Sequence, residues 1–122
     1  MTRTVVNEDA RLWHVTVTLS GATHDPDVVS EALSRLAEER PFLHALRYAS
    51  STAEISYWEQ AEAMVDAASL ALRVWNEHRG SAGLPDWQVV GLEVLERNTF
   101  RRRAHESAAP VVGLHDARPR PL

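Results

Sequence analysis

Two kinds of hydrophobic repeat alternate along this 122-residue chain, and their order limits the folds it can adopt. Two segments repeat every three to four positions, which is typical of amphipathic helices: residues 26–40 and 61–79. Four segments repeat every two positions, which is typical of strands that bury one face: residues 13–19, 42–49, 53–59 and 87–96. The pattern therefore predicts the order strand, helix, strand, strand, helix, strand.

The ends of the helices carry signals of their own. Asp25 is a good N-cap, Pro26 suits the first helical position, and Asp27 lies favourably at the positive end of the helix dipole. Pro41 prevents the first helix from continuing. Gly80 is the expected C-terminal cap of the second helix.

A short hairpin joins the two central strands and sorts their side chains by chemistry. With a two-residue loop at residues 50–51, the apolar pairs fall on one face of the sheet and an ion pair on the other. The expected pairs are Leu46 with Ile55, His44 with Tyr57, and Arg47 with Glu54.

This order matches the split β-α-β arrangement, so we expect an α+β, ferredoxin-like two-layer sandwich. Right-handed crossovers place both helices on one face of a four-stranded antiparallel sheet with strand order 4-1-3-2. The domain covers residues 12–103, after a flexible lead of residues 1–11 and before a disordered Pro/Arg tail of residues 104–122. The predicted core is Trp13, Val15, Val17, Leu19, Val29, Leu33, Leu36, Leu46, Ile55, Met64, Val65, Ala68, Leu72, Trp75, Val90, Leu92 and Val94.

The sheet face without helices is the expected site for a partner or ligand. Its alternate positions are too apolar for a fully solvated surface, and large apolar patches often mark interfaces. We therefore expect a homodimer through this open face, with a small ligand as a further possibility and a solvated face as the plain alternative. The candidate interface or ligand residues are His14, Leu43, Arg47, Glu54, Trp58, Trp87, Val89 and Glu93.

Catalysis is the second hypothesis. His14 and Glu54 are weak candidates for a general base pair, with Arg47 holding an organic acid in a dimeric α/β-barrel enzyme. RNA binding is the third, because some ferredoxin-like domains stack bases on sheet aromatics. The acidic Glu54 and Glu93 on the same face make a nucleic-acid partner less favoured. We expect no metal or cofactor, since neither a metal-ligand spacing nor a Gly-rich phosphate loop is present.

Composition narrows the class further. The chain has no cysteine, a net charge of −4, and no lysine among its 13 basic residues. Because neither a secretory signal nor a long apolar run is visible, we expect a cytoplasmic protein without a membrane span. The segment Arg-Pro-Phe-Leu-His-Ala-Leu-Arg-Tyr at residues 40–48, with arginine as the only base, resembles small uncharacterised proteins of GC-rich bacteria. That resemblance implies no particular activity, and the ferredoxin-like superfold hosts many.

Overall fold

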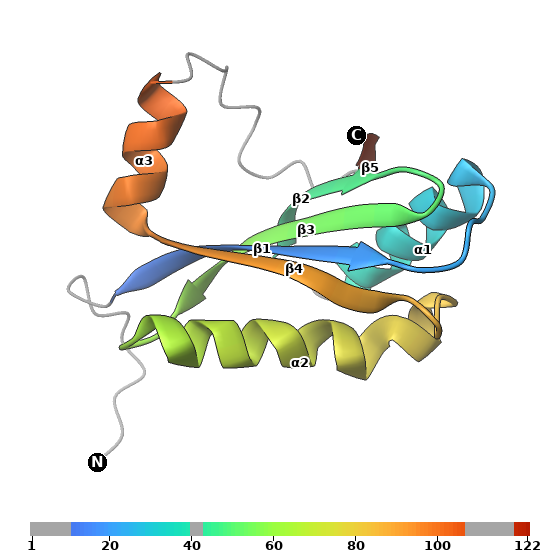
Figure 1. The fold of residues 1–122 in the computed structure, drawn as a ribbon, viewed down its shortest axis with the longest axis horizontal. Coiled ribbons are helices and arrows are strands. Elements are labelled where there is room, and N and C mark those ends of the chain that lie inside the picture. The colour runs from blue at the N-terminus through green and yellow to red at the C-terminus, as the bar shows by residue number, and fades with distance from the viewer. Residues whose placement is uncertain (1–10, 40–42, 107–118) are drawn as a thin grey trace.

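The computed structural model describes residues 11–39, 43–106 and 119–122, in which five strands and three helices alternate (Figure 1). The predicted strand and helix order is confirmed, followed by one more helix and one more strand. The elements are β1 (Leu12–Ser20), α1 (Pro26–Glu39), β2 (Leu43–Tyr48), β3 (Thr52–Gln60), α2 (Met64–Ala82), β4 (Gln88–Glu96), α3 (Arg97–Glu106) and β5 (Pro119–Pro121).

The sheet is five-stranded and mixed, with the order β4-β1-β3-β2-β5. Its first four strands are antiparallel neighbours in the predicted order 4-1-3-2. The expected four-stranded antiparallel sheet is nevertheless wrong at one edge, because β5 pairs in parallel with β2. Helix α3 runs to Glu106, past the expected tail boundary at residue 103, and Pro119–Pro121 of the expected tail forms β5. The rest of that tail and nearly all of the expected lead lie outside the described residues.

Helices α1 and α2 pack side by side on one face of the sheet, α1 against β2 and β5 and α2 against β1 and β4. The expected cap of α1 is present, since the Asp27 backbone N–H donates to Asp25 Oδ1 at 2.9 Å. Helix α2 runs two residues past Gly80, the expected cap, and ends at Ala82. Gly83 ends it in the left-handed conformation at φ 88°, which glycine adopts without steric cost.

The core lies between the two helices and the sheet. On β1, alternate residues are buried on the helix face, as the period of two predicted. Trp75 is buried, and its Nε1 donates to the Trp87 carbonyl at 2.8 Å. The buried apolar residues are Trp13, Val15, Val17, Leu19, Val29, Ala32, Leu33, Leu36, Leu43, Leu46, Ala53, Ile55, Tyr57, Ala67, Ala71, Trp75, Ala82, Leu84 and Trp87.

A bulge in β4 corrects the expected faces of that strand. Thr18 pairs with Gly91 and Leu19 with Val89, so Val90 is an extra residue between two pairs. The extra residue reverses the alternation before it. Val89 therefore packs against the core rather than on the open face, and Val90, expected in the core, is 64% exposed.

Alternation along the strand also predicts the wrong environment for Trp87. It precedes β4 and is fully buried, with its Nε1 donating to the Ala22 carbonyl at 3.0 Å. Its ring lies so close to the backbone of Gly21 that a Cβ there would overlap it. Trp87 thus closes the end of the core and is not part of an open-face interface.

A second bulge shifts β2. Leu43 pairs with Tyr57 and Ala45 with Ser56, which leaves His44 as the extra residue. The expected pairing of His44 with Tyr57 is therefore wrong. Leu43, expected on the open face, is buried on the helix face beside Tyr57. The pairs beyond the bulge, Leu46 with Ile55 and Arg47 with Glu54, are confirmed.

Helix α2 buries a narrower stripe than its periodicity predicted. The small side chains of Ala67 and Ala71 face the core. The larger Met64, Val65 and Leu72, expected in the core, are exposed. Leu92 is exposed too, and its strand, β4, is an edge strand of the described sheet.

Candidate functional site

The open face is built from side chains that alternate with the core residues of β1 and β3. Strand pairing places His14 beside Trp58, Thr16 beside Ser56, and Thr18 beside Glu54. On the other side of β1, Glu93 pairs with Thr16. Of the eight sequence-predicted site residues, the structure gathers five on this face: His14, Arg47, Glu54, Trp58 and Glu93.

An aromatic cluster closes one end of the open face. The rings of His14 and Phe100 stack with centroids 3.9 Å apart and an interplanar angle of 25°. Trp58 meets both of them edge-on, at 5.1 Å from His14 and 5.0 Å from Phe100. Phe100 belongs to α3, on the side of the sheet opposite α2 (Figure 1). As a result, His14 is only 6% exposed.

The remainder of the open face is polar. The hydroxyl groups of Thr16 and Ser56 are 3.0 Å apart. Two ion pairs flank them, Arg47 with Glu54 at 3.8 Å and Arg103 with Glu93 at 3.5 Å. All four charged side chains remain at least a third exposed, so each pair contributes little to stability. The described part of this face therefore carries a polar strip beside the aromatic cluster, and not a large apolar patch.

The weak catalytic pair is not assembled on this face. His14 lies on β1, and Glu54 pairs with Thr18, which is four residues further along β1. The two residues are therefore separated by about 13 Å along the strand direction. His14 and Glu54 are thus too far apart to act as a pair. No group of three or more His, Asp or Glu side chains that could hold a metal occurs within residues 11–39, 43–106 and 119–122.

Two groups with shifted protonation lie on the other side of the sheet. Burial and the nearby Glu59 carboxylate raise the pKa of Tyr57 well above its ordinary value of 10. Partial burial raises the pKa of Glu59 above 4.5, only partly opposed by a backbone hydrogen bond. Both side chains lie on the helix face of the sheet, away from the open face. Burial is the main cause of both pKa shifts.

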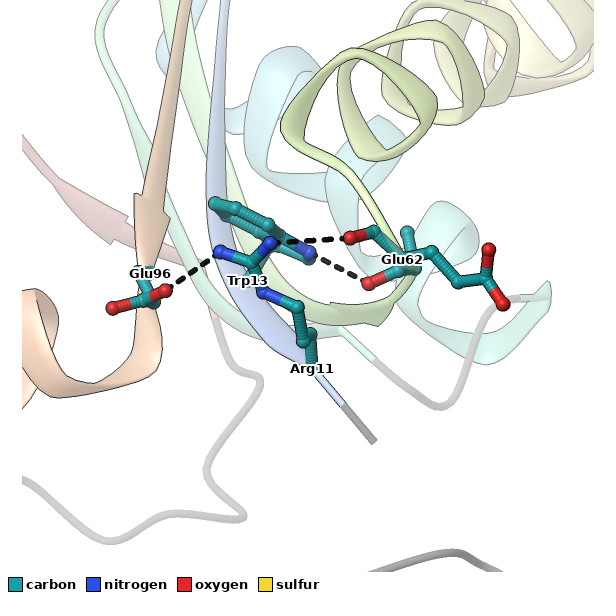
Figure 2. A network of polar contacts seen from close by, with 5 residues as sticks. Arg11, Trp13, Glu62 and Glu96 are labelled. Carbon is teal, nitrogen blue, oxygen red and sulfur yellow. Dashed lines mark hydrogen bonds and ion pairs between the residues drawn. The ribbon is translucent and has the colours of Figure 1, made fainter. Parts of the chain in front are cut away.

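A polar network ties the end of the sheet to the start of α2 (Figure 2). The Arg11 guanidinium lies 4.5 Å from the centroid of the Trp13 ring, pairs with Glu96 at 2.7 Å, and donates to the Glu62 carbonyl at 3.2 Å. Trp13 Nε1 donates to the Ala61 carbonyl at 2.9 Å. This network holds the C-terminal end of β4 in place beside β1.

A second surface carries the exposed apolar side chains that the open face lacks. We call it the edge patch and define it as Val65 and Leu72 of α2 with Val90 and Leu92 of β4. Val65 and Val90 are 68% and 64% exposed. Because His78 of α2 pairs with Glu39 of α1, the row containing Val65 and Leu72 lies on the side of α2 away from α1. That side adjoins β4, which runs along α2 (Figure 1).

Comparison with known proteins gives the chain a family but no activity. A family model described as a domain of unknown function, DUF8830, matches residues 12–111. The chain belongs to this family. The match spans β1 to α3, so the aromatic cluster and the edge patch both lie within the DUF8830 region. No curated protein matches the chain.

Sequence reasoning missed Phe100 and the edge patch. Phe100 is a single aromatic residue in a short, otherwise polar helix, so it gave no periodic signal. Val65 and Leu72 do repeat with helical spacing, but that spacing predicts them in the core and not in an exposed patch. Within the described residues, no helix is both long and apolar enough to span a membrane.

Proposed function

We propose that this domain is non-catalytic and acts as a cytoplasmic homodimer joined along β4 and the edge patch. The observation that carries the proposal is a contrast between the two exposed sides of α2. The side away from β4 is charged and carries Asp66, Arg73 and Glu77, of which Arg73 and Glu77 pair at 3.9 Å. The side next to β4 carries the uncharged Val65, Ala68, Ser69, Leu72 and Asn76, and its one charged residue, Arg79, lies in the last turn of the helix.

A long exposed side with a single charge, at its C-terminal end, is unusual for a helix facing water. Surface helices normally turn charged residues to solvent and apolar residues to a partner layer. Here the larger apolar residues face outward beside a sheet edge, and the two surfaces adjoin. Exposed apolar surface of this kind commonly marks an interface.

The edge strand itself supports the same proposal. β4 has nine residues, about 30 Å of strand, without a proline, and its only charged residues are Glu93 and Glu96. Exposed edges of this length are usually guarded by prolines, bulges or several charges, because unpaired N–H and C=O groups can extend a sheet with another chain. The bulge at Val90 twists one end of β4 but leaves the segment from Gly91 to Glu96 regular.

A second copy is the partner that fits this edge best. Two antiparallel β4 strands can pair about a twofold axis so that the helices of both copies stay on the same face of one continuous sheet. With the axis at Leu92, that residue faces its own copy, Val90 faces Val94, and Glu93 faces Gly91. Apolar residues then meet on the helix face, and no like charges lie directly opposite each other. An axis at Glu93 would instead oppose two carboxylates.

The open face supports the homodimer less well. The expected patch consisted of Leu43, Trp58, Trp87 and Val89, and only Trp58 remains there. A small ligand on the open face stays a prediction. The enzyme and RNA alternatives lose support from the burial of His14 and the separation of His14 from Glu54.

A pair of substitutions on α2 tests the proposal. Leu70 and Leu72 are both 39% exposed, but only Leu72 lies in the edge patch. Light scattering after size exclusion should give the wild type twice the 13.6 kDa of one chain. Leu72→Lys should raise the dimer Kd at least tenfold, or about 1.4 kcal/mol, with the far-ultraviolet dichroism preserved. Leu70→Lys is the matched control and should leave the dimer intact.

Two outcomes would contradict the proposal. One is a wild type that remains monomeric at about 100 μM, where a micromolar complex would be almost fully formed. The other is equal weakening of the dimer by Leu70→Lys and Leu72→Lys, which would assign the interface to another surface.

A further inference from the structure

The C-terminal residues occupy the edge of the sheet opposite β4. In β5, Pro119, Arg120 and Pro121 pair in parallel with Leu46, Arg47 and Tyr48 of β2. The Leu122 backbone N–H then donates to the Tyr48 carbonyl at 2.8 Å. Figure 1 shows this short strand beside β2, with the C-terminus at its end. The chain therefore binds its own last four residues as an added strand.

The order of residues in this segment suits a sheet edge. Successive residues of a strand direct their N–H groups to opposite sides, so Arg120 shares the β2 side with Leu122. Pro119 and Pro121 then fall on the outward side, where a proline loses no sheet hydrogen bond. A strand of this pattern can add to β2, but it presents no outward N–H from its prolines to another strand.

The segment lies outside the buried core. Arg120, Pro121 and Leu122 are exposed, and Pro119 is half-buried. No side chain of these four residues belongs to the core cluster of the described residues. The segment pairs with β2 and packs against α1. A strand without core contacts should exchange with another segment of the same pattern.

We propose that the β2 edge is a binding site for an extended peptide of the pattern Pro-x-Pro-Leu, and that the C-terminus of the chain is its resident occupant. Backbone pairing to Leu46–Tyr48 supplies the binding, as in other complexes where a peptide adds a strand to a sheet. The alternating prolines suit this site, because an edge strand needs backbone N–H donors only on the side that faces β2. This inference does not rest on the homodimer, because β5, which pairs with β2, and β4 lie at opposite edges of the sheet.

Two variants of the full chain separate an occupied site from a vacant one. Leu122→Pro removes the N–H that donates to Tyr48 and should release the C-terminus. Leu122→Ala removes the side chain but keeps that N–H, so it is the matched control. The probe is a peptide of residues 117–122, Ala-Arg-Pro-Arg-Pro-Leu, titrated while the backbone amide NMR signals of residues 45–48 are followed.

The Leu122→Pro chain should bind the peptide at least tenfold more tightly than the wild type or Leu122→Ala. Its amide signals should shift on release and return towards the wild-type positions as peptide is added. Two results would overturn the proposal: amide signals that Leu122→Pro leaves unchanged, or a released edge that binds the peptide no better than the wild type. Light scattering on the same samples reports the oligomeric state separately, so failure of the dimer would be seen on its own.

Discussion

The ring of Phe100 stacks on the ring of His14 at a centroid distance of 3.9 Å, and this contact attaches α3 to the open face. No residue of α3 is fully buried, so Phe100 supplies most of the apolar contact of the helix. Phe100→Ala should lower the free energy of unfolding by about 2 kcal/mol, less than a fully buried phenylalanine would. Arg102→Ala, on the exposed outer side of α3, should change it by less than about 0.5 kcal/mol.

Chemical denaturation followed by amide exchange measures this effect. In Phe100→Ala, the amides of α3 should exchange faster while those of β1 and β3 stay protected. Unchanged protection of α3 would show that other contacts hold the helix.

Alanine substitutions at two glycines should change the stability of the fold in opposite directions. Gly21 lies against the ring of Trp87, so Gly21→Ala should destabilise the fold by about 1–3 kcal/mol through steric overlap. Gly80 lies in the last turns of α2 with no other atom near the position of an added Cβ. Gly80→Ala should therefore stabilise the fold by about 0.5–1 kcal/mol. Thermal melts of both variants test this, and a stabilising Gly21→Ala would contradict the packing of Trp87.

Glu59 should make the stability depend on pH. Burial raises the pKa of Glu59 above 4.5, so the folded chain binds the proton more tightly than the unfolded chain does. The associated stability is fully present below pH 4.5 and is lost as the pH rises through the folded pKa. Glu59→Gln removes this dependence, and should raise the melting temperature at pH 7 more than at pH 4.

Melting curves between pH 4 and pH 8 check this sign. Glu54→Gln on the same strand removes the ion pair with Arg47 and should not raise the melting temperature at pH 7. A Glu59→Gln gain that is equal at pH 4 and pH 7 would contradict the assignment.

Sequence patterns predicted the fold well where local signals and packing agree. β1 alternates cleanly, and both of its neighbours cover it, so its faces were predictable from residue order alone. The cap at Asp25 and the pairing of Arg47 with Glu54 also follow from local chemistry.

The errors arose where a neighbouring strand, or the packing of a helix on the sheet, determines which side chains are buried. The bulges at His44 and Val90 exist only relative to the neighbouring strand, and each moved predicted open-face residues into the core. On α2, the alanine stripe and the larger Val65 and Leu72 both repeat with helical spacing, so periodicity did not show which row faces the sheet. The prolines of β5 suggested disorder, although at a sheet edge their missing N–H groups are harmless.

The candidate site was predictable only in part. Alternation assigned His14, Trp58 and Glu93 to the open face, and the structure places them there. The burial of His14 could not be foreseen, because it depends on a single phenylalanine in a helix that follows the predicted fold.

The central claim, that two copies pair along β4 about Leu92, is tested most directly by disulfide cross-linking. The chain has no cysteine, so Leu92→Cys introduces its only thiol. Residues paired across antiparallel strands lie within the Cα separation that a disulfide spans. Val28→Cys on α1 is the control, since Val28 is 43% exposed and Leu92 38%. Under mild oxidation, the account predicts that most Leu92→Cys chains form a covalent dimer while Val28→Cys chains stay monomeric. A Leu92→Cys chain that remains uncross-linked, or that cross-links no faster than Val28→Cys, would contradict it.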